Sequence, residues 1–430
     1  MPAARVFYLL ALTTFLGMVG VLVPAAARWA LAADAAIVAA FALDFFRVRR
    51  SPLAAVRQWP ELLVQGTAAT VRLELANPGR RPLRVRLREA LHPGVAAAPA
   101  RTECELPPGG RATWSYQVRP RRRGEHDVGP LDARVLGPWR LAWAQRRLLA
   151  PERRRVYPQV RWEGKVGHLL LLAHRHALGG NPQRLQGLGR EPYGVREYLP
   201  GDPTNKIHWK ATARHGRLVT REETWERGAR LVVLLDCARG MSGQDGERSK
   251  LDHALAAALA LARVAASRGD RVTLAAFSDR VERTLRLHGG RRALQAAYGG
   301  VYDLAARLVE PAFDVAAEYA SQLESRRSTV VLFTSVVDLA AAELLRQAVL
   351  RLERRHRPIL INLEDPELTA LAHGAPATPE DAFARVAALE ILLANRRLGK
   401  RLRHAGVRVV HTAADRLALE ALEAYLALFR

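Results

Sequence analysis

The sequence predicts a multi-domain protein with an N-terminal two-helix transmembrane hairpin, a small β-sandwich and a C-terminal α/β domain. Three observations predict this fold class: two apolar runs near the N-terminus, short alternating segments divided by turn residues, and a long region where apolar strands alternate with helical stretches. The expected boundaries are 1–50 for the hairpin, 51–160 for the β module, 161–228 for a connecting segment that packs on the α/β domain, and 229–430 for that domain.

The hairpin is predicted from two apolar runs, 6–23 and 29–46, each close to the ~20 residues that cross the hydrocarbon core of a bilayer. The connection between them is so short that the two helices must be antiparallel. Positive charge flanks the pair at Arg5 and at 47–50, whereas only Arg28 lies in the turn. The charge bias therefore places both ends in the cytoplasm, as a multi-pass anchor in the inner (plasma) membrane.

A cleaved signal peptide is the alternative for the first run, because 25–27 is a row of three alanines that fits a cleavage site. The second run would then stop transfer, and the large body would still lie inside the cell. Two acidic residues interrupt the second run. We expect Asp44, near its end, to reach water, and Asp34 either to pair or to mark a shallow helix.

The β module is predicted from two segments in which apolar and polar residues alternate, 70–76 and 83–87. The turn sequence Asn-Pro-Gly lies between them. Further strands are expected at 112–118, 131–136 and 141–144. The basic run 119–123 is interpreted first as a solvated face beside the membrane, and second as a site of attraction to anionic lipid headgroups. Nucleic acid ranks third, because basic charge is not interleaved with aromatic residues. Cys104 is isolated, and we expect it to be reduced in the cytoplasm.

The α/β domain is predicted from continuous apolar strands that alternate with helices, which favours a mostly parallel, Rossmann-like sheet covered on both faces. Strands are expected at 231–235, 272–277, 329–333, 359–363 and 407–411, and helices at 251–267, 339–355, 379–404 and 416–429. Ligands of such folds bind at the carboxyl ends of the strands, which makes Asp236 the first residue to test. The helix at 379–404 ends in five basic residues; a solvated face is the default, and docking to an acidic partner or a membrane is second.

The segment 190–226 has the densest pattern of charged, aromatic and turn residues. Thr204 or Asp202 is expected to cap a short helix that carries Ile207, Trp209 and Ala213, with Trp209 as a buried anchor. A second set is interpreted as a fixed network of ion pairs and hydrogen bonds rather than a catalytic cluster: Arg196, Glu197, Asp202 and Arg214. His208 and His215 lack cysteine or carboxylate partners at ligand spacing, so a metal site is not expected there.

Composition excludes two classes and leaves two open. An apolar fraction of 49% excludes a wholly disordered chain, and two cysteines exclude a disulfide scaffold. The net charge of +24, in which only five of 66 basic residues are lysine, predicts attraction to nucleic acid or to an anionic membrane. No glycine-rich phosphate loop is found, so the chain is not expected to hydrolyse ATP.

The segment matches a long signature of the form R-E-Y-x-x-G-D followed by I-x-W and A-R. The matching residues are Gly194, Arg196, Glu197, Tyr198, Pro200, Gly201, Asp202, Ile207, Trp209, Lys210, Ala213, Arg214 and Leu218. The chain thus resembles the bacterial family called domain of unknown function fifty-eight, with Lys206 in place of the common Arg and His208 in place of Asp. The resemblance implies a membrane anchor, a von Willebrand factor A-like domain, and a MoxR-type AAA+ ATPase as partner in the assembly or maturation of other proteins. It implies no established enzyme activity.

A von Willebrand A domain normally holds a divalent metal through Asp-x-Ser-x-Ser and a later Asp, because a hard cation needs several oxygen ligands. This chain has Ala238 and Gly240 after Asp236, and Ser335 in place of the later Asp. We therefore expect a degenerate metal site with no bound metal or cofactor, although Ser242, Thr334 or Asp338 remain as substitute ligands. Asp236 is expected to pair with an arginine or to cap a helix, and Cys237 to be a structural thiol.

The leading hypothesis is a membrane-anchored, non-enzymatic adaptor that binds the ATPase, the lipid around its hairpin and client proteins not yet identified. A metal-dependent adhesion-type module is the first alternative. A basic nucleic-acid-binding protein is the second, motivated by charge alone, and we expect no nucleic-acid partner. A hydrolase has no support from a Ser/His/Asp or Cys/His constellation.

Overall fold

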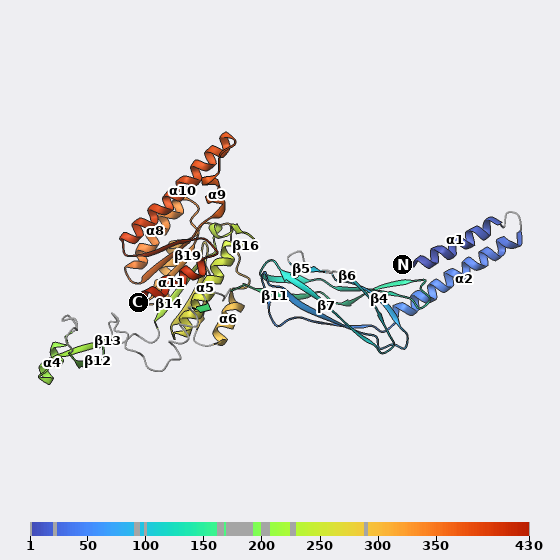
Figure 1. Ribbon diagram of the computed structural model, residues 1–430, viewed down its shortest axis with the longest axis horizontal. Coiled ribbons are helices and arrows are strands. Elements are labelled where there is room, and N and C mark those ends of the chain that lie inside the picture. Colours follow the sequence, from blue (N-terminus) through green and yellow to red (C-terminus); the bar gives the residue numbers. More distant parts are fainter. Residues whose placement is uncertain are drawn as a thin grey trace. The chain divides into compact units, whose positions relative to one another are not determined.

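The computed structural model describes residues 2–19, 24–89, 95–98, 101–160, 167–168, 192–198, 207–223, 229–287 and 291–429. The chain divides into two compact units, Met1–Tyr157 and Pro158–Arg430 (Figure 1). The first contains two apolar helices and a β-rich region, and the second contains an α/β region. This coarse order is the one predicted from the sequence.

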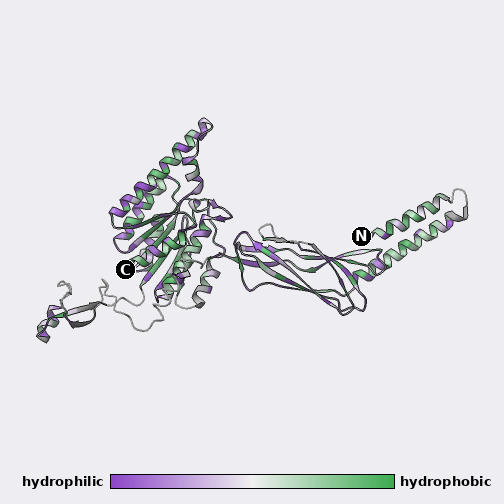
Figure 2. Cartoon of the chain, viewed as in Figure 1, coloured by the Kyte–Doolittle hydropathy of each residue, from purple (hydrophilic) through white to green (hydrophobic). Residues whose placement is uncertain are grey.

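The two N-terminal helices are α1 (Ala4–Val19) and α2 (Pro24–Arg49), which pack side by side and are mostly apolar along their length (Figure 2). One of them is long and apolar enough to cross a membrane, over Ala27–Arg49, whereas the apolar part of α1 is shorter, over Ala4–Met18. Asp34 of α2 accepts a hydrogen bond of 2.6 Å from the Thr13 hydroxyl of α1. The expectation that Asp34 finds a partner is therefore met.

The end of α2 is joined to the β-rich region through Asp44, and the prediction that Asp44 reaches water is wrong. Its side chain is fully buried and accepts hydrogen bonds from the backbone N–H groups of Trp139, Leu141 and Ala142, at 3.0–3.1 Å. The turn carries no side chain at Gly137, where a Cβ atom would overlap the Asp44 carboxylate. A buried carboxylate requires such donors, because desolvation of an unpaired charge is strongly unfavourable.

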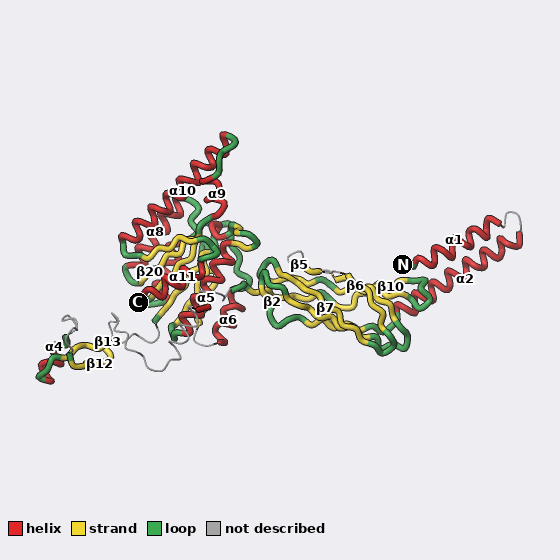
Figure 3. The backbone as a smooth tube through the Cα atoms, in the orientation of Figure 1, coloured by secondary structure: helices red, strands yellow, loops and turns green. Residues whose placement is uncertain are grey.

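The β-rich region contains two four-stranded antiparallel sheets and a smaller third one (Figure 3). The first has the order β1 (Ala54–Gln58), β3 (Ala69–Ala76), β7 (Arg111–Pro120), β5 (Val95–Ala98). The second has the order β10 (Trp143–Leu149), β9 (Leu131–Leu136), β4 (Leu83–Glu89), β6 (Arg101–Leu106). The third has the order β2 (Leu63–Val64), β11 (Glu152–Tyr157), β8 (Gly124–Val128). Inward-facing residues of both four-stranded sheets share one core, including Leu73, Leu75, Val85, Leu87 and Val135.

The basic run 119–123 does not lie at the end of the β-rich region that meets α2. The Arg111 end of β7 is near α2, because Arg111 pairs with Ala76, which in turn pairs with Ala54 at the start of β1. Pro120 lies nine residues further along β7, roughly 30 Å away at the rise of an extended strand. The run 119–123 therefore lies at the far end of β7 from α2, and its interpretation as charge beside a membrane stays a prediction.

The α/β region is built on a six-stranded sheet, parallel except for an antiparallel edge strand. Its order is β18 (Val281–Leu287), β17 (Arg271–Phe277), β14 (Arg230–Asp236), β19 (Thr329–Thr334), β20 (Arg357–Leu363), β21 (Arg408–Thr412). One face packs on α5 (Lys250–Ser267), α6 (Arg291–Val301) and α11 (Leu417–Leu426). The other face packs on α7 (Phe313–Leu323), α8 (Leu339–Glu353) and α10 (Pro379–His404), which follows the short α9 (Pro366–His373).

The described part of the signature segment forms two paired strands with a short helix between them. Strands β12 (Pro192–Glu197) and β13 (Val219–Glu223) pair antiparallel, and the chain between them contains α4 (Trp209–His215). The Nδ1 atom of His208 accepts the backbone N–H of Ala211 as the N-cap of α4, and Gly216 ends the helix in the left-handed conformation, at φ 64°. The cap predicted at Thr204 or Asp202 is therefore wrong. His208 stands where the family signature has Asp, which is itself a favoured N-cap.

Candidate functional site

The candidate site lies at the carboxyl ends of β14 and β19, which are neighbours in the sheet but not in sequence. The connections leave these two strands on opposite sides of the sheet, which makes their junction the topological switch point where α/β folds bind ligands. Asp236 ends β14 and Thr334 ends β19. The position that the sequence singled out is therefore the one where a ligand site is expected.

Asp236 is buried, with 1% of its surface exposed, and has two hydrogen bonds. The Thr334 hydroxyl donates to it at 2.6 Å and the backbone N–H of Ala238 at 2.8 Å. Burial raises its pKa to about 6, and these two hydrogen bonds only partly oppose the rise. Neither role expected for Asp236 is found among the described residues: it pairs with no arginine, and the short helix that follows, Arg239–Met241, has no side-chain cap.

Lys250 is the residue that sequence reasoning missed. It is 1% exposed at the first turn of α5, and its ammonium group lies among oxygen atoms. The Nζ atom is 2.5 Å from Asp365 Oδ2 and 3.2 Å from both the Gly240 carbonyl oxygen and Ser335 Oγ. A cation is disfavoured at a helix N-terminus, so these acceptors must hold it there. The only sequence signal was a lysine at a helix start, next to the Ser-x-x-Asp capping box of Ser249 and Asp252.

Asp365 forms an ion pair with Lys250 and also caps α9 by accepting hydrogen bonds from the backbone N–H groups of Glu367 and Leu368. Its burial raises the pKa of the carboxyl, but the hydrogen bond and charge of Lys250, together with the two backbone N–H groups, hold the pKa below its ordinary value. The Lys250–Asp365 ion pair thus joins the strand-end edge to the start of the α9–α10 segment.

The positions predicted from the sequence to be degenerate metal ligands are occupied by the protein's own groups. A Cβ atom on Gly240 would overlap the Ser335 carbonyl oxygen, and one on Gly243 would lie 2.7 Å from Lys250 Cε. Ser335, where the later Asp is expected, donates to the Leu363 carbonyl at 3.1 Å and faces Lys250. Ala238 is buried and contributes only its backbone. A serine at position 240 would therefore need the backbone to move.

Two groups of ion pairs lie around the carboxyl ends of the strands. Arg239 contacts both Asp338, at 2.8 Å, and Glu310, at 2.9 Å, while Asp338 also caps α8 by accepting from the Ala341 N–H. In the second group Arg307 bridges Asp279 and Glu282. Asp338, a proposed substitute ligand, is thus engaged by a cation and a helix end. Among the described residues no group of three His, Cys, Asp or Glu side chains is arranged to hold a metal ion.

The signature residues are only partly brought together. Gly201 and Asp202 lie outside the described residues, and Arg196 is placed only by its backbone, which pairs with Thr220. Glu197 forms an exposed ion pair of 3.3 Å with Arg217, which was not in the expected network.

The remaining signature side chains are placed around α4. Ile207 bridges to Thr220, Tyr198 is half-buried and bonded through its backbone to Leu218, and Ala213 and Arg214 are exposed on the helix. The prediction that Trp209 is a buried anchor is wrong, since its side chain is 68% exposed.

The first half of α10 presents an exposed apolar row at helical spacing, which we call the α10 face. It is formed by Phe383, Val386, Leu389 and Leu393, which are 77%, 55%, 38% and 47% exposed. The same helix continues into exposed basic residues at 396, 397, 400, 401 and 403. Its second half is fixed to the domain by buried Leu398 and Leu402 and by a hydrogen bond from Asn395 to the Val336 carbonyl.

Comparisons with known proteins give one family and a set of weak structural likenesses. The family model described as "Protein of unknown function DUF58" matches residues 194–410. No curated protein matches the chain. Solved structures that match include an ASH/PapD-like domain of human CEP192, with 15% identity over 24% of this chain and 81% of that chain, at a TM-score of 0.17. A FixG-related protein from Vibrio parahaemolyticus matches with 8% identity over 24% and 96%, at a TM-score of 0.18.

Proposed function

The chain belongs to the family of proteins of unknown function DUF58, and on that premise we propose that it is a membrane-anchored, non-enzymatic adaptor that binds other proteins. Its partner is a MoxR-type AAA+ ATPase, as the family resemblance implies. Helices α1 and α2 form a two-pass hairpin in the inner membrane, with the large body in the cytoplasm. The apolar length of α2 and the arginines that flank the helices support this arrangement.

The α/β region is, in this proposal, a von Willebrand A-type domain whose metal site has lost its function. Its support is the strand order, the helices on both faces and the position of Lys250 among the oxygen atoms at the switch point. Because ion pairs of the protein itself fill the carboxyl-end edge of the sheet, partner proteins bind instead to the outer surface of the domain.

The observation that carries the adaptor proposal is the α10 face. Four apolar side chains at helical spacing stay exposed on a helix whose second half packs on the domain through Leu398 and Leu402, and large exposed apolar rows mark protein-binding sites in soluble domains. The basic residues that follow favour a partner with an acidic surface next to an apolar groove.

The test is a pull-down of the full-length protein from native membranes, with and without nucleotide, followed by identification of the bound proteins. We expect an AAA+ ATPase with the wild type and its loss with the double substitution Phe383→Ser and Val386→Ser. The matched control is Leu308→Ser, because Leu308 is apolar and 85% exposed but lies outside the α10 face. Absence of any such ATPase in both nucleotide conditions contradicts the proposal.

A metal-dependent adhesion module is the competing function, and the Lys250 ammonium argues against it. A divalent cation would have to displace a buried positive charge and would gain few new oxygen ligands. Calorimetry of the purified protein with Mg²⁺ or Mn²⁺ decides between them, and we expect no heat of binding.

A further inference from the structure

The turn of residues 137–142 meets both N-terminal helices at one level. Ala3, just before α1, donates its backbone N–H to the Leu141 carbonyl at 2.8 Å, and Asp44 of α2 is held by the same turn. From Pro24 to Leu43, α2 has twenty residues, which span roughly 30 Å and match the thickness of the hydrocarbon core. If the helices cross the membrane as proposed above, this turn lies where the hydrocarbon ends.

Three arginines and a tryptophan gather at that level, and we call this group the helix foot. It consists of Arg5, Arg47, Arg140 and Trp139, all exposed. The Arg47 guanidinium lies 4.7 Å from the centroid of the Trp139 ring. Among the described residues none of the three arginines has an acidic partner within ion-pair distance. The foot therefore presents three positive charges that form no ion pair with any described residue.

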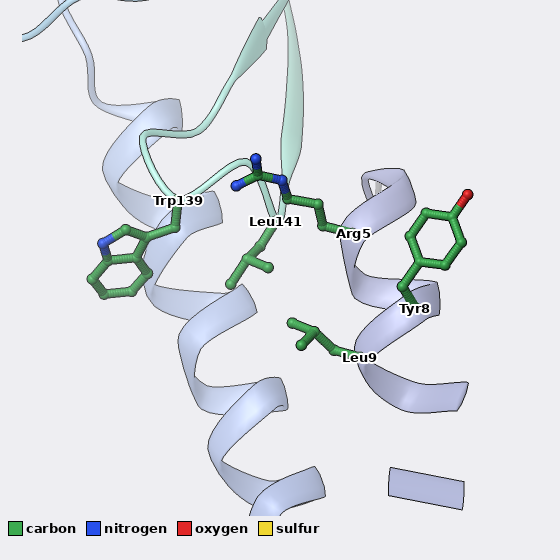
Figure 4. A pocket seen from close by; sticks show the side chains of 5 residues that line it. All are labelled: Arg5, Tyr8, Leu9, Trp139 and Leu141. Carbon is green, nitrogen blue, oxygen red and sulfur yellow. The ribbon is translucent and has the colours of Figure 1, made fainter. Parts of the chain in front are cut away.

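A pocket of about 300 Å³ opens within the foot, lined by Arg5, Tyr8, Leu9, Trp139 and Leu141. In Figure 4 the Arg5 side chain extends over Leu141, and Leu9 points from α1 toward α2, below Leu141. Charge thus lies above an apolar surface that continues along the helices. A phospholipid has the same order, with its phosphate above its acyl chains.

Arg140 has an unusual backbone conformation, which gives an independent argument. Its φ is 58°, and it is the one residue other than glycine with a positive φ in the described part of the chain. This conformation lets the N–H groups on either side of Arg140 converge on Asp44, yet glycine would adopt it at lower free energy. Backbone strain retained at a residue whose side chain pairs with no described acidic group indicates a use for that side chain.

We propose that the helix foot binds the phosphate group of an anionic phospholipid, with the acyl chains against Leu9 and Leu141. Guanidinium groups suit this task, because they donate paired hydrogen bonds to phosphate oxygens and stay charged in every condition. Trp139 is suited to the same interfacial level, where aromatic rings are enriched in membrane proteins. The inference rests on the membrane anchoring proposed above.

The test is retention of lipid by the full-length protein reconstituted in phosphatidylcholine nanodiscs with and without phosphatidylglycerol. Native mass spectrometry after release measures which lipids stay bound. We expect phosphatidylglycerol to be retained at least about fivefold over phosphatidylcholine, a preference that Arg5→Gln reduces severalfold. Arg72→Gln is the matched control, because it removes the same charge from an exposed position on β3.

Arg140→Gly separates binding from folding. We expect this variant to be as thermally stable as the wild type or more stable, yet to retain less phosphatidylglycerol. Equal retention by Arg5→Gln, Arg140→Gly and Arg72→Gln, or no preference between the two lipids, overturns the lipid site alone. Extraction of the wild type from native membranes by alkaline carbonate overturns the anchor as well, so the two proposals fail in different ways.

Discussion

At the scale of single residues, Asp236 and Lys250 are both ionisable and both buried at the carboxyl-end edge of the sheet, but they have different partners. Asp236 has hydrogen bonds from a hydroxyl and an amide but no counter-charge, whereas Lys250 has a carboxylate and two further oxygen atoms. Burial therefore acts on the pKa of Asp236 with little opposition. The two residues should respond differently to substitution.

Replacement of Asp236 by Asn should stabilise the protein at neutral pH. The pKa of Asp236 is about 6 when folded, against an ordinary value of 3.8, so the native state favours its protonated form. The wild type should lose stability as the pH rises from about 4 to above 6, by an amount on the order of 3 kcal/mol. Asn mimics the protonated carboxyl and does not titrate.

The difference in thermal stability between Asp236→Asn and the wild type, measured from pH 4 to pH 8, should therefore be small at the acidic end, grow between about pH 4 and pH 6, and level off above that. Comparing the two proteins at each pH cancels the titration of all other groups. A constant difference across this range would show that Asp236 has an ordinary pKa.

Replacement of Lys250 by Met should destabilise the protein, because it leaves the Asp365 carboxylate without its cation. Removal of one partner from a buried ion pair costs about 3–5 kcal/mol. The exposed Lys400→Met is the control and should change stability by less than about 0.5 kcal/mol. Thermal unfolding of the detergent-solubilised protein measures both, and equal effects would mean that the Lys250 ammonium has no structural role.

At the scale of elements, the join between α2 and the turn at 137–142 depends on a carboxylate and on the glycine beside it. Gly137→Ala should displace Asp44 from its three N–H donors and destabilise the protein by about 2–3 kcal/mol, similar to Asp44→Ala. The double variant should be little worse than either single one, because both remove the same contacts. Additive losses in thermal unfolding would contradict this. Gly299→Ala, which has open space around it, is the control.

The elements of the α/β region follow closely from sequence pattern, because continuous apolar strands and amphipathic helices are local signals. The helix predicted at 379–404 has those bounds, and the strand predicted at 272–277 starts one residue earlier. Strand β18 was missed, since half-exposed alternation of arginine and apolar residues resembles a loop. Helices α6, α7 and α9 were missed as well.

The polar contacts of the candidate site could not be predicted in the same way. Lys250 meets Asp365 across 115 residues of sequence, and Asp44 meets the turn across 95 to 98. Which buried polar groups pair depends on the packed fold rather than on neighbouring residues. The position of Asp236 at a strand end was predictable from topology, but its partners were not.

At the scale of the whole molecule, the net charge of +24 is distributed in a way that bears on topology. Arginines gather at the helix foot, while the run at 119–123 lies at the far end of β7. Basic residues near the ends of membrane helices orient them, whereas those far along a folded body have little influence. The charge therefore supports a cytoplasmic location of the helix foot more than a nucleic-acid surface.

Cysteine labelling in intact cells tests this orientation directly. In a background with Cys104→Ser and Cys237→Ala, a single cysteine from Pro24→Cys lies at the start of α2, where the proposed span begins, and one from Glu380→Cys lies exposed on α10. A membrane-impermeant maleimide should label the first in intact cells and the second only after permeabilisation, because Arg28, the one arginine near this end of α2, is outnumbered by those at the opposite ends of the helices. Labelling of Glu380→Cys in intact cells would place the body outside and remove the basis for a cytoplasmic ATPase partner.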